Sequence, residues 1–186
     1  MDKDVSQYHA TFLYVNLNRS KEAHDMLEHH AQQLNTSFIC GSEPNWSKVK
    51  NGTWISDDNQ DASIKPTEHA PKIIEHGKGQ GHCWIGTDIF TLFCCYVSPN
   101  ADCNTFHSFL YDLENNIKDK NKPVLIVGDF NSKSTLWGST RENSRGTAVV
   151  EWAARNDLFL VNDGRCPTFR RGESASFLDL TFVSAG

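Results

Sequence analysis

Hydrophobic positions recur along this chain at two different spacings, which predicts a mixture of strands and helices. The run Val124-Leu125-Ile126-Val127 is the clearest strand, and its unbroken apolar character indicates cover on both faces. In 20–34 and 105–119 the apolar positions recur at helical spacing instead. We therefore expect strands at 10–17, 37–42, 71–76, 82–87, 89–97, 124–127, 158–162 and 177–183, and helices at 20–34, 105–119 and 145–156.

The order of these elements favours sheets packed together, with helices outside, over a simple doubly wound sheet. Strands and helices are mixed, but pairs of strands that resemble hairpins interrupt any strict alternation. The polar stretch 43–70 is expected to be loop, with a short hairpin around Trp54 and Ile64. The predicted fold class is α/β or α+β with mixed sheets.

Length and composition indicate a globular protein without a membrane segment. A chain of 186 residues suits one domain, or one and part of a second, and 38% hydrophobic residues argue against wholesale disorder. No apolar run approaches the ~20 residues that a membrane-spanning helix needs. The N-terminus, MDKDVSQYHA, is polar and acidic, unlike a signal or transit peptide. We therefore expect an intracellular protein with no membrane partner.

The cysteines predict neither disulfides nor a metal centre. None of the six forms a C-x-x-C pair, and several lie in apolar runs, so we expect buried free thiols in a reducing compartment. The eight histidines are scattered, and His29-His30 lacks the spacing of a helical zinc site. Structural zinc is not expected.

The charge distribution changes this picture slightly. The net charge is −5, but residues 1–121 carry 10 basic against 16 acidic side chains, whereas residues 122–186 carry 8 against 7. Basic side chains are thus relatively enriched in the last third of the chain. An uneven charge distribution is often only a solvated surface, so it identifies no partner by itself.

The most informative motif is Gly128-Asp129-Phe130-Asn131, which directly follows the clearest strand. In an extended backbone, Asp129 and Asn131 would point to the same side while Phe130 faces the core. A carboxylate beside a carboxamide can orient water and bind a phosphoryl oxygen. An ordinary turn remains the equal alternative, because Gly, Asp and Asn are common turn formers.

Other polar side chains also lie at expected strand ends. Asn16 ends the first strand, Glu43 follows the second, and Tyr96 precedes Ser98-Pro99. Asp179 lies inside the last apolar run, where an ionised carboxylate is costly unless it has a partner. The structural alternatives are a helix cap for Asn16, a surface charge for Glu43 and a core ring for Tyr96. If they converge, their hard oxygen donors suit Mg²⁺.

These positions, taken in order, resemble the endonuclease/exonuclease/phosphatase superfamily. The motifs are Asn16 in YVNLNRS, Glu43-Pro44, Tyr96-x-Ser98-Pro99, Gly128-Asp129-Phe130-Asn131 and Asp179-Leu180-Thr181-Phe182. More narrowly, NLNRSKEA, GDFNSKSTLWGS, Arg145-Gly146 and PTFRRG…SFLDLTF are similar to the apurinic-type endonuclease domain of non-LTR (LINE-like) retrotransposons. The resemblance covers about residues 11–184. It implies one domain over residues 1–186, folded as a four-layer sandwich of two face-to-face sheets with helices outside.

The resemblance also implies roles for single residues. Glu43 matches the principal Mg²⁺ ligand, for which Mn²⁺ can substitute, and Asn16 lies beside it. The other matches are Asp129 for positioning or deprotonating the attacking water, Asn131 for binding the scissile phosphate, Tyr96 for orienting that phosphate, Asp179 for pairing with a catalytic histidine, and Thr168 for the base of a DNA-contacting hairpin at 169–176. The implied reaction is hydrolysis of one phosphodiester bond, which leaves a free 3′-hydroxyl.

The resemblance further implies double-stranded DNA as the target, a reverse transcriptase in the same polyprotein, and a nuclear site of action. DNA contacts are expected from five basic side chains, although solvated loop charges remain the alternative: Lys133, Arg141, Arg145, Arg170 and Arg171.

One family motif has no counterpart here. Family members carry a Ser-Asp-His triplet in a final strand beyond the position of Asp179, and the sequence contains no such triplet. We therefore expect a fragment of a longer polyprotein or a degenerate copy, with impaired catalysis. Two functional alternatives stay open: a DNA-binding module without catalysis, and a phosphomonoesterase or sphingomyelinase-like member of the same superfamily.

Overall fold

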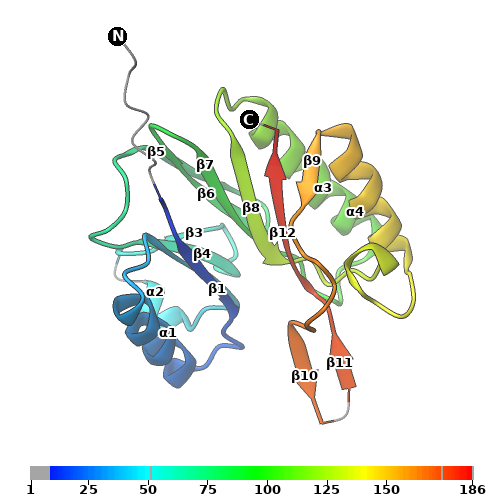
Figure 1. The fold of residues 1–186 in the computed structure, drawn as a ribbon, viewed down its shortest axis with the longest axis horizontal. Helices are drawn as coiled ribbons and strands as arrows, with labels where there is room; N and C mark the ends of the chain where they lie inside the picture. The colour runs from blue at the N-terminus through cyan, green and yellow to red at the C-terminus, as the bar shows by residue number, and fades with distance from the viewer. Residues whose placement is uncertain (1–8, 51, 173, 186) are drawn as a thin grey trace.

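The computed structural model describes residues 9–50, 52–172 and 174–185, which form two main sheets and a separate hairpin (Figure 1). The four-stranded sheet has the order β1-β2-β4-β3 and consists of β1 (Phe12–Asn16), β2 (Phe38–Ser42), β3 (Ile55–Ser56) and β4 (Ala62–Pro66). The six-stranded sheet has the order β5-β6-β7-β8-β12-β9 and consists of β5 (Ile73–Gly79), β6 (His82–Thr87), β7 (Thr91–Tyr96), β8 (Val124–Asp129), β9 (Leu158–Leu160) and β12 (Asp179–Ser184). The hairpin consists of β10 (Phe169–Arg171) and β11 (Ser174–Ser176).

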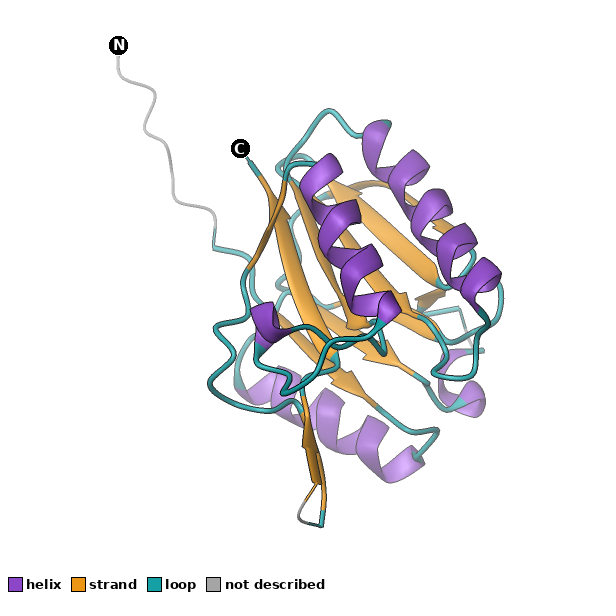
Figure 2. Ribbon diagram, turned by 90° about the vertical axis from the view of Figure 1, so that its right-hand side faces the viewer, coloured by secondary structure: helices purple, strands orange, loops and turns teal. Residues whose placement is uncertain are grey.

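The two sheets lie face to face, and helices cover their outer faces (Figures 1 and 2). Helices α1 (Lys21–Gln33) and α2 (Trp46–Val49) lie on the side of the four-stranded sheet, whereas α3 (Cys103–Lys118) and α4 (Ser144–Arg155) cover the six-stranded sheet. A single turn of 3-10 helix, η1 (Thr135–Trp137), lies between β8 and α4. This arrangement confirms the predicted α/β sandwich of two mixed sheets.

Each boundary between layers has its own apolar core. The two sheets meet through a buried layer that includes Phe38 and Ile64 from one sheet and Leu92 and Val127 from the other. Because an apolar strand face must be covered, burial of this layer keeps the two sheets in contact. As a result, the ends of β1 and β2 lie close to the ends of β7 and β8.

The core under α3 and α4 is rich in aromatic rings. The predicted apolar face of α3 is buried, which confirms the helical periodicity of that segment. Phe130 lies at the centre of the cluster, with its ring centroid 5.9 Å from Phe109, 6.2 Å from Trp152 and 5.7 Å from Phe182. Such aromatic pairs contribute about 0.5–1.5 kcal/mol each beyond the burial of area. The ring of Phe130 therefore anchors the segment between Asp129 and Asn131.

The cysteine prediction is correct for four of the six thiols. Cys40, Cys83, Cys94 and Cys95 are free and buried in the sheets. The exceptions are Cys103 and Cys166, which are free but exposed, because the start of α3 and the loop after β9 face outward.

Two short elements and several strand limits differ from the prediction. The sequence does not indicate α2 or η1, because an element of three or four residues is too short to show periodicity. Pairing with β6 extends β5 to Gly79, and pairing with β12 extends β8 to Asp129. None of the helices in the described segments has the length and apolar character needed to cross a membrane.

Gly128 provides a test of how closely the central strands approach each other. An added Cβ would lie 2.3 Å from the carbonyl oxygen and 2.7 Å from the Cβ of Cys95 on β7. Gly128→Ala should therefore lower the free energy of unfolding by about 2–3 kcal/mol or more, because two paired strands must move apart. Urea denaturation followed by circular dichroism measures this loss.

Gly172→Ala is the control for this prediction. Its added Cβ meets nothing within 4 Å, although its φ of 59° is left-handed, so the cost should stay near 1 kcal/mol. Equal losses in the two variants would contradict the close approach at Gly128.

Candidate active site

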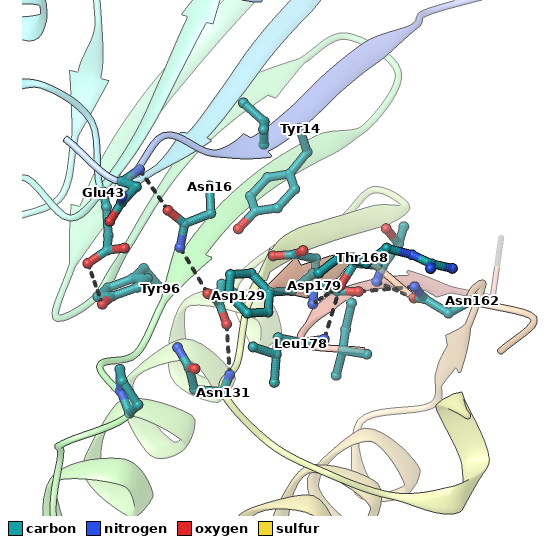
Figure 3. A pocket seen from close by; sticks show the side chains of 17 residues that line it. Tyr14, Asn16, Glu43, Tyr96, Asp129, Asn131, Asn162, Thr168, Leu178 and Asp179 are labelled. Atoms are coloured by element: carbon teal, nitrogen blue, oxygen red, sulfur yellow. Dashed lines mark hydrogen bonds between the residues drawn. The ribbon is translucent and has the colours of Figure 1, made fainter. Parts of the chain in front are cut away.

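The polar residues predicted at strand ends converge on one pocket of about 840 Å³ (Figure 3). Asn16 ends β1, Glu43 follows β2, and Tyr96 ends β7. Asp129 ends β8 and Asp179 begins β12. β1 runs parallel to β2, and β7 runs parallel to β8. The carboxyl ends of two strands from each sheet therefore meet at the same place.

A line of hydrogen bonds joins the two sheets through Asp129. The side-chain amide of Asn16 donates to Asp129 Oδ2 at 3.0 Å, and the backbone N–H of Asn131 donates to Asp129 Oδ1 at 3.0 Å. Asn16 Oδ1 in turn accepts from the backbone N–H of Asn18 at 2.9 Å. The two hydrogen bonds, one to each oxygen, therefore fix the orientation of the Asp129 carboxylate.

Asn131 faces the pocket, but not through the extended backbone that the sequence predicted. Its φ is 44°, in the left-handed region, and its side-chain amide donates to the Val97 carbonyl at 3.1 Å. The backbone N–H of Phe130 donates to Leu178 O at 3.1 Å. Because Phe130 is buried and held in this way, the chain turns sharply after it, and Asn131 still lines the pocket with Asp129.

Glu43 and Tyr96 form a second polar pair in the pocket. The Tyr96 hydroxyl donates to Glu43 Oε1 at 2.9 Å. Burial and the neighbouring Glu43 carboxylate raise the pKa of Tyr96, so the phenol remains a hydrogen-bond donor. Glu43 has a φ of 45°, a left-handed backbone conformation that residues other than Gly, Asn and Asp rarely adopt. Such strain at a pocket residue persists only where the surroundings enforce it.

Asp179 lies opposite Asp129 in the pairing of β12 with β8. Its backbone is fixed by two side chains: the Thr168 hydroxyl accepts from its N–H at 3.1 Å, and Asn162 donates to its carbonyl at 3.1 Å. Asp179 Oδ1 is buried, and no residue in the described part of the chain hydrogen-bonds to it. That this carboxylate needs a partner therefore stays a prediction of the sequence.

The two aspartates of the pocket, Asp129 and Asp179, ionise less readily than exposed aspartates. Burial raises the pKa of Asp129 to about 7, and the nearby Asp179 and Glu43 carboxylates contribute in the same direction. Burial also raises the pKa of Asp179. A cation placed among these groups would favour their ionised forms.

The donor set suits a hydrated divalent cation rather than an ion enclosed by protein ligands. In the described residues, no three His, Cys, Asp or Glu side chains are grouped so that they could hold a metal ion. The pocket instead offers the Glu43 carboxylate and the Asn16 carboxamide. Mg²⁺ prefers hard oxygen donors, needs few protein ligands and keeps several waters, so these residues fit it.

The predicted DNA-contacting side chains do not all reach the pocket. Arg170 lines it, and Lys133 and Arg141 are exposed in the loop between Asn131 and α4. Arg145 instead binds the loop after β7, because its guanidinium donates to the carbonyls of Ser98 at 2.9 Å, Pro99 at 3.2 Å and Ala101, and lies 4.9 Å from the Phe106 ring centroid. Arg171 ends β10, and its side chain lies outside the described part of the structure, as does residue 173 of the predicted hairpin.

Tyr14 and Asn162 are among the pocket residues that the sequence analysis did not identify. The Tyr14 hydroxyl lies 2.6 Å from Ser42 Oγ, and Ser42 donates to the Cys95 carbonyl at 3.2 Å. Tyr14 is two positions before Asn16 on one strand, so strand periodicity could have identified it. Asn162 donates to Asp179 O and accepts from Thr181 N–H at 2.7 Å. No sequence pattern indicates Asn162, because Asn is a common loop residue.

Two comparisons, with family models and with curated proteins, concern the chain as a whole. A family model described as endonuclease-reverse transcriptase matches residues 90–186, just over half of the chain. A search of curated proteins found no match.

Several solved structures share the fold. The endonuclease domain of TRAS1, a telomere-specific non-LTR retrotransposon, has a TM-score of 0.79 and 24% identity, over 93% of this chain and 83% of that chain. An AP endonuclease from Archaeoglobus fulgidus has a TM-score of 0.67 and 8% identity, over 95% and 87%. A mannosyl-6-phosphatase from Bacteroides thetaiotaomicron has a TM-score of 0.64 and 16% identity, over 95% and 85%. At these identities the likeness shows the fold, which nucleases and a phosphatase share.

The raised pKa of Asp129 predicts a pH dependence of stability. A carboxyl whose pKa is about 7 in the folded protein and ~3.9 when unfolded binds its proton more tightly in the folded state. The proton bound to Asp129 stabilises the folded state fully below about pH 4, and this stabilisation is lost as the pH rises through about 7. Without divalent cations, the unfolding free energy of the wild type should therefore fall by about 1–3 kcal/mol relative to Asp129→Asn between pH 5 and pH 8. Urea titrations in EDTA at several pH values measure the difference, and a constant gap would contradict the assignment.

The left-handed backbone at Asn131 predicts an unusual order of stabilities. Asn131→Gly and Asn131→Ala lose the same hydrogen bond to Val97, but only the alanine pays about 1–2 kcal/mol for a left-handed φ. The glycine variant should therefore unfold at a higher urea concentration than the alanine variant. As a control, the same pair of substitutions at Glu151 in α4 should give the opposite order, by about 0.5–1 kcal/mol. Greater stability of the alanine variant at position 131 would be inconsistent with the observed turn.

Proposed function

The chain belongs to the endonuclease-reverse transcriptase family, and from that premise we propose that it nicks double-stranded DNA by Mg²⁺-dependent hydrolysis of one phosphodiester bond. Its fold, shared with the TRAS1 endonuclease domain, supports a nuclease or another phosphoesterase. In this proposal the residues 1–186 act as one catalytic domain. The reaction leaves a 3′-hydroxyl that primes reverse transcription by another part of the same polyprotein, in the nucleus.

The observation that carries the proposal is the arrangement of two polar pairs around one pocket. Asp129 is held by Asn16 and by the backbone of Asn131, while Tyr96 and Glu43 are hydrogen-bonded to each other. A phosphodiester needs a positioned water on one side and neutralisation of the developing charge on the other. The two pairs provide groups of both kinds.

Glu43 and Asn16 would hold the ion, with Mn²⁺ as a substitute for Mg²⁺. When bound there, the ion supplies positive charge that stabilises the leaving 3′-oxygen. Asn16 would bind the ion through its side-chain oxygen, while its side-chain N–H₂ still donates to Asp129. Both roles are compatible, because the nitrogen and oxygen of a carboxamide point in different directions and the oxygen has a second lone pair besides the one that accepts from the Asn18 N–H.

The remaining residues act on the water and the phosphate. Asp129 orients the attacking water and accepts its proton, since both of its oxygens are held from other directions. Asn131 would donate its second amide hydrogen to a non-bridging phosphate oxygen, because the first is donated to the Val97 carbonyl. Tyr96 would orient the phosphate by turning its single O–H from Glu43 to a phosphate oxygen once Glu43 holds the ion. Asp179 is buried beside Asp129 and would pair with a cationic or hydrogen-bond-donating group at the phosphate.

DNA binding is assigned to exposed cations around the pocket. Arg170 stands on the β10–β11 hairpin, which projects from the body (Figure 1), and Lys133 and Arg141 lie in the loop after Asn131. Arg171 is included on the resemblance alone. Thr168 would fix the base of the hairpin, because its hydroxyl accepts from the N–H groups of Leu178 and Asp179. Such cations bind phosphates with strong salt dependence and little sequence preference.

The test is nicking of supercoiled plasmid. With Mg²⁺, the protein should convert supercoiled to open-circular DNA, and a polymerase should extend the nick without prior phosphatase treatment, because the product ends in a 3′-hydroxyl. Glu43→Gln should reduce the rate by at least about 100-fold, as expected for loss of a group that stabilises the transition state. The matched control, Glu151→Gln on α4, should retain the wild-type rate, because this exposed side chain lies outside the pocket.

Other outcomes distinguish the alternatives. DNA binding without nicking at any Mg²⁺ or Mn²⁺ concentration would support a non-catalytic DNA-binding module. Release of inorganic phosphate from a phosphomonoester, with intact plasmid, would support a phosphatase of the same fold. Nicking that is unaffected by Glu43→Gln would contradict the proposed metal site.

A further inference from the structure

Arg19 lies outside the pocket, in the loop that leaves β1, and its side chain bridges two other loops. Its Nη1 donates to the carbonyls of Pro44 at 3.2 Å and Gln60 at 3.1 Å, and its Nη2 forms an ion pair with Asp61. The side chain is 48% exposed, so it resembles an ordinary surface cation. Its charge, however, is matched by Asp61, and its donors are directed at protein acceptors.

The backbone of Arg19 is tied to the same region. Its N–H donates to the Glu43 carbonyl at 2.8 Å, and its carbonyl accepts from the Asn45 side chain at 2.6 Å. Asn18 and Arg19 have φ values of 44° and 60°, so the chain reverses direction there. This turn directs the Arg19 side chain back across the loop that contains Glu43.

Glu43 itself is held by residues on both sides of this bridge. Its N–H donates to the Asp61 carbonyl at 2.8 Å, and its own carbonyl accepts from Arg19 N–H. The backbone carbonyl of Glu43 is therefore hydrogen-bonded to Arg19, and its backbone N–H is hydrogen-bonded to Asp61, which the Arg19 side chain binds. A left-handed φ at a glutamate is unfavourable and persists only if its neighbours enforce it.

We propose that Arg19 is a positioning residue that locks Glu43 in its left-handed conformation and so directs the Glu43 carboxylate into the pocket. The inference rests on the proposed function, in which that carboxylate holds the divalent cation. The planar guanidinium suits this role, because it reaches two carbonyls and one carboxylate at once. A lysine ammonium can point at these acceptors but cannot reproduce the fixed fork.

The first experiment measures the lock without any metal. Amide hydrogen exchange, followed by NMR, reports the protection of the Glu43 N–H. Arg19→Ala should speed this exchange at least tenfold, whereas the buried amides of β2, such as Cys40, should keep their protection and show that the protein is folded. Arg19→Lys, which retains the charge and most of the side chain, should give an intermediate increase.

The second experiment measures metal affinity, with Mn²⁺ as the probe in electron paramagnetic resonance titrations. Arg19→Ala should weaken Mn²⁺ binding about 10–100-fold, the usual cost of losing a residue that orients a metal ligand. Arg155→Ala is the matched control, because Arg155 is also exposed and paired with a carboxylate, Glu114, but lies on α4. The control should leave both Mn²⁺ affinity and Glu43 exchange unchanged.

The outcomes separate this inference from the proposed function. Unchanged exchange at Glu43 in Arg19→Ala would overturn the inference. So would unchanged Mn²⁺ affinity in Arg19→Ala if Glu43→Gln weakens binding. If Glu43→Gln leaves Mn²⁺ affinity unchanged, the proposed metal site is wrong, and the exchange result alone decides whether Arg19 locks Glu43.

Discussion

Burial of the apolar layer between the two sheets is the constraint on which the rest of the structure depends. Phe38 and Ile64 of one sheet pack against the layer that contains Leu92 and Val127 of the other. This packing brings the carboxyl ends of β1 and β2 to those of β7 and β8. The polar side chains at these strand ends therefore share one pocket beside the apolar layer.

The gathered polar groups are costly to the fold, and the surrounding structure offsets that cost locally. Asp129 is buried beside Asp179, and two positions of the pocket, Glu43 and Asn131, have left-handed backbones. Phe130 compensates at Asn131 by anchoring its turn in an aromatic cluster, whereas Glu43 is held by hydrogen bonds from neighbouring loops. The pocket therefore combines backbone strain with repulsion among carboxyl groups, and a positive charge placed among them would lower that repulsion, a pattern typical of functional sites.

The sequence predicted the elements that have strong internal periodicity or uniform apolar character. The helix at 105–119 and the strand at 124–127 were found because burial imposes a repeating pattern on such segments. The four-residue α2 was missed, because it depends on an Asn45 cap rather than on periodicity. The strand limits depend on pairing with other strands, which a local pattern does not contain.

By itself, the sequence determined the mixed α/β fold class and placed Asn16, Glu43 and Asp129 at expected strand ends, whereas their assignment to one site followed from the family resemblance of the motifs that contain them. Only the tertiary structure decided which groups the basic side chains bind. Arg145 was expected to contact DNA, yet its guanidinium is bound to carbonyls of the loop that follows β7, whereas Arg19 bridges two loops near Glu43. These contacts join residues 25 to 47 positions apart. Long-range contacts of this kind leave no local periodicity, because a flexible cation is compatible with almost any exposed position until the folded chain supplies its acceptors.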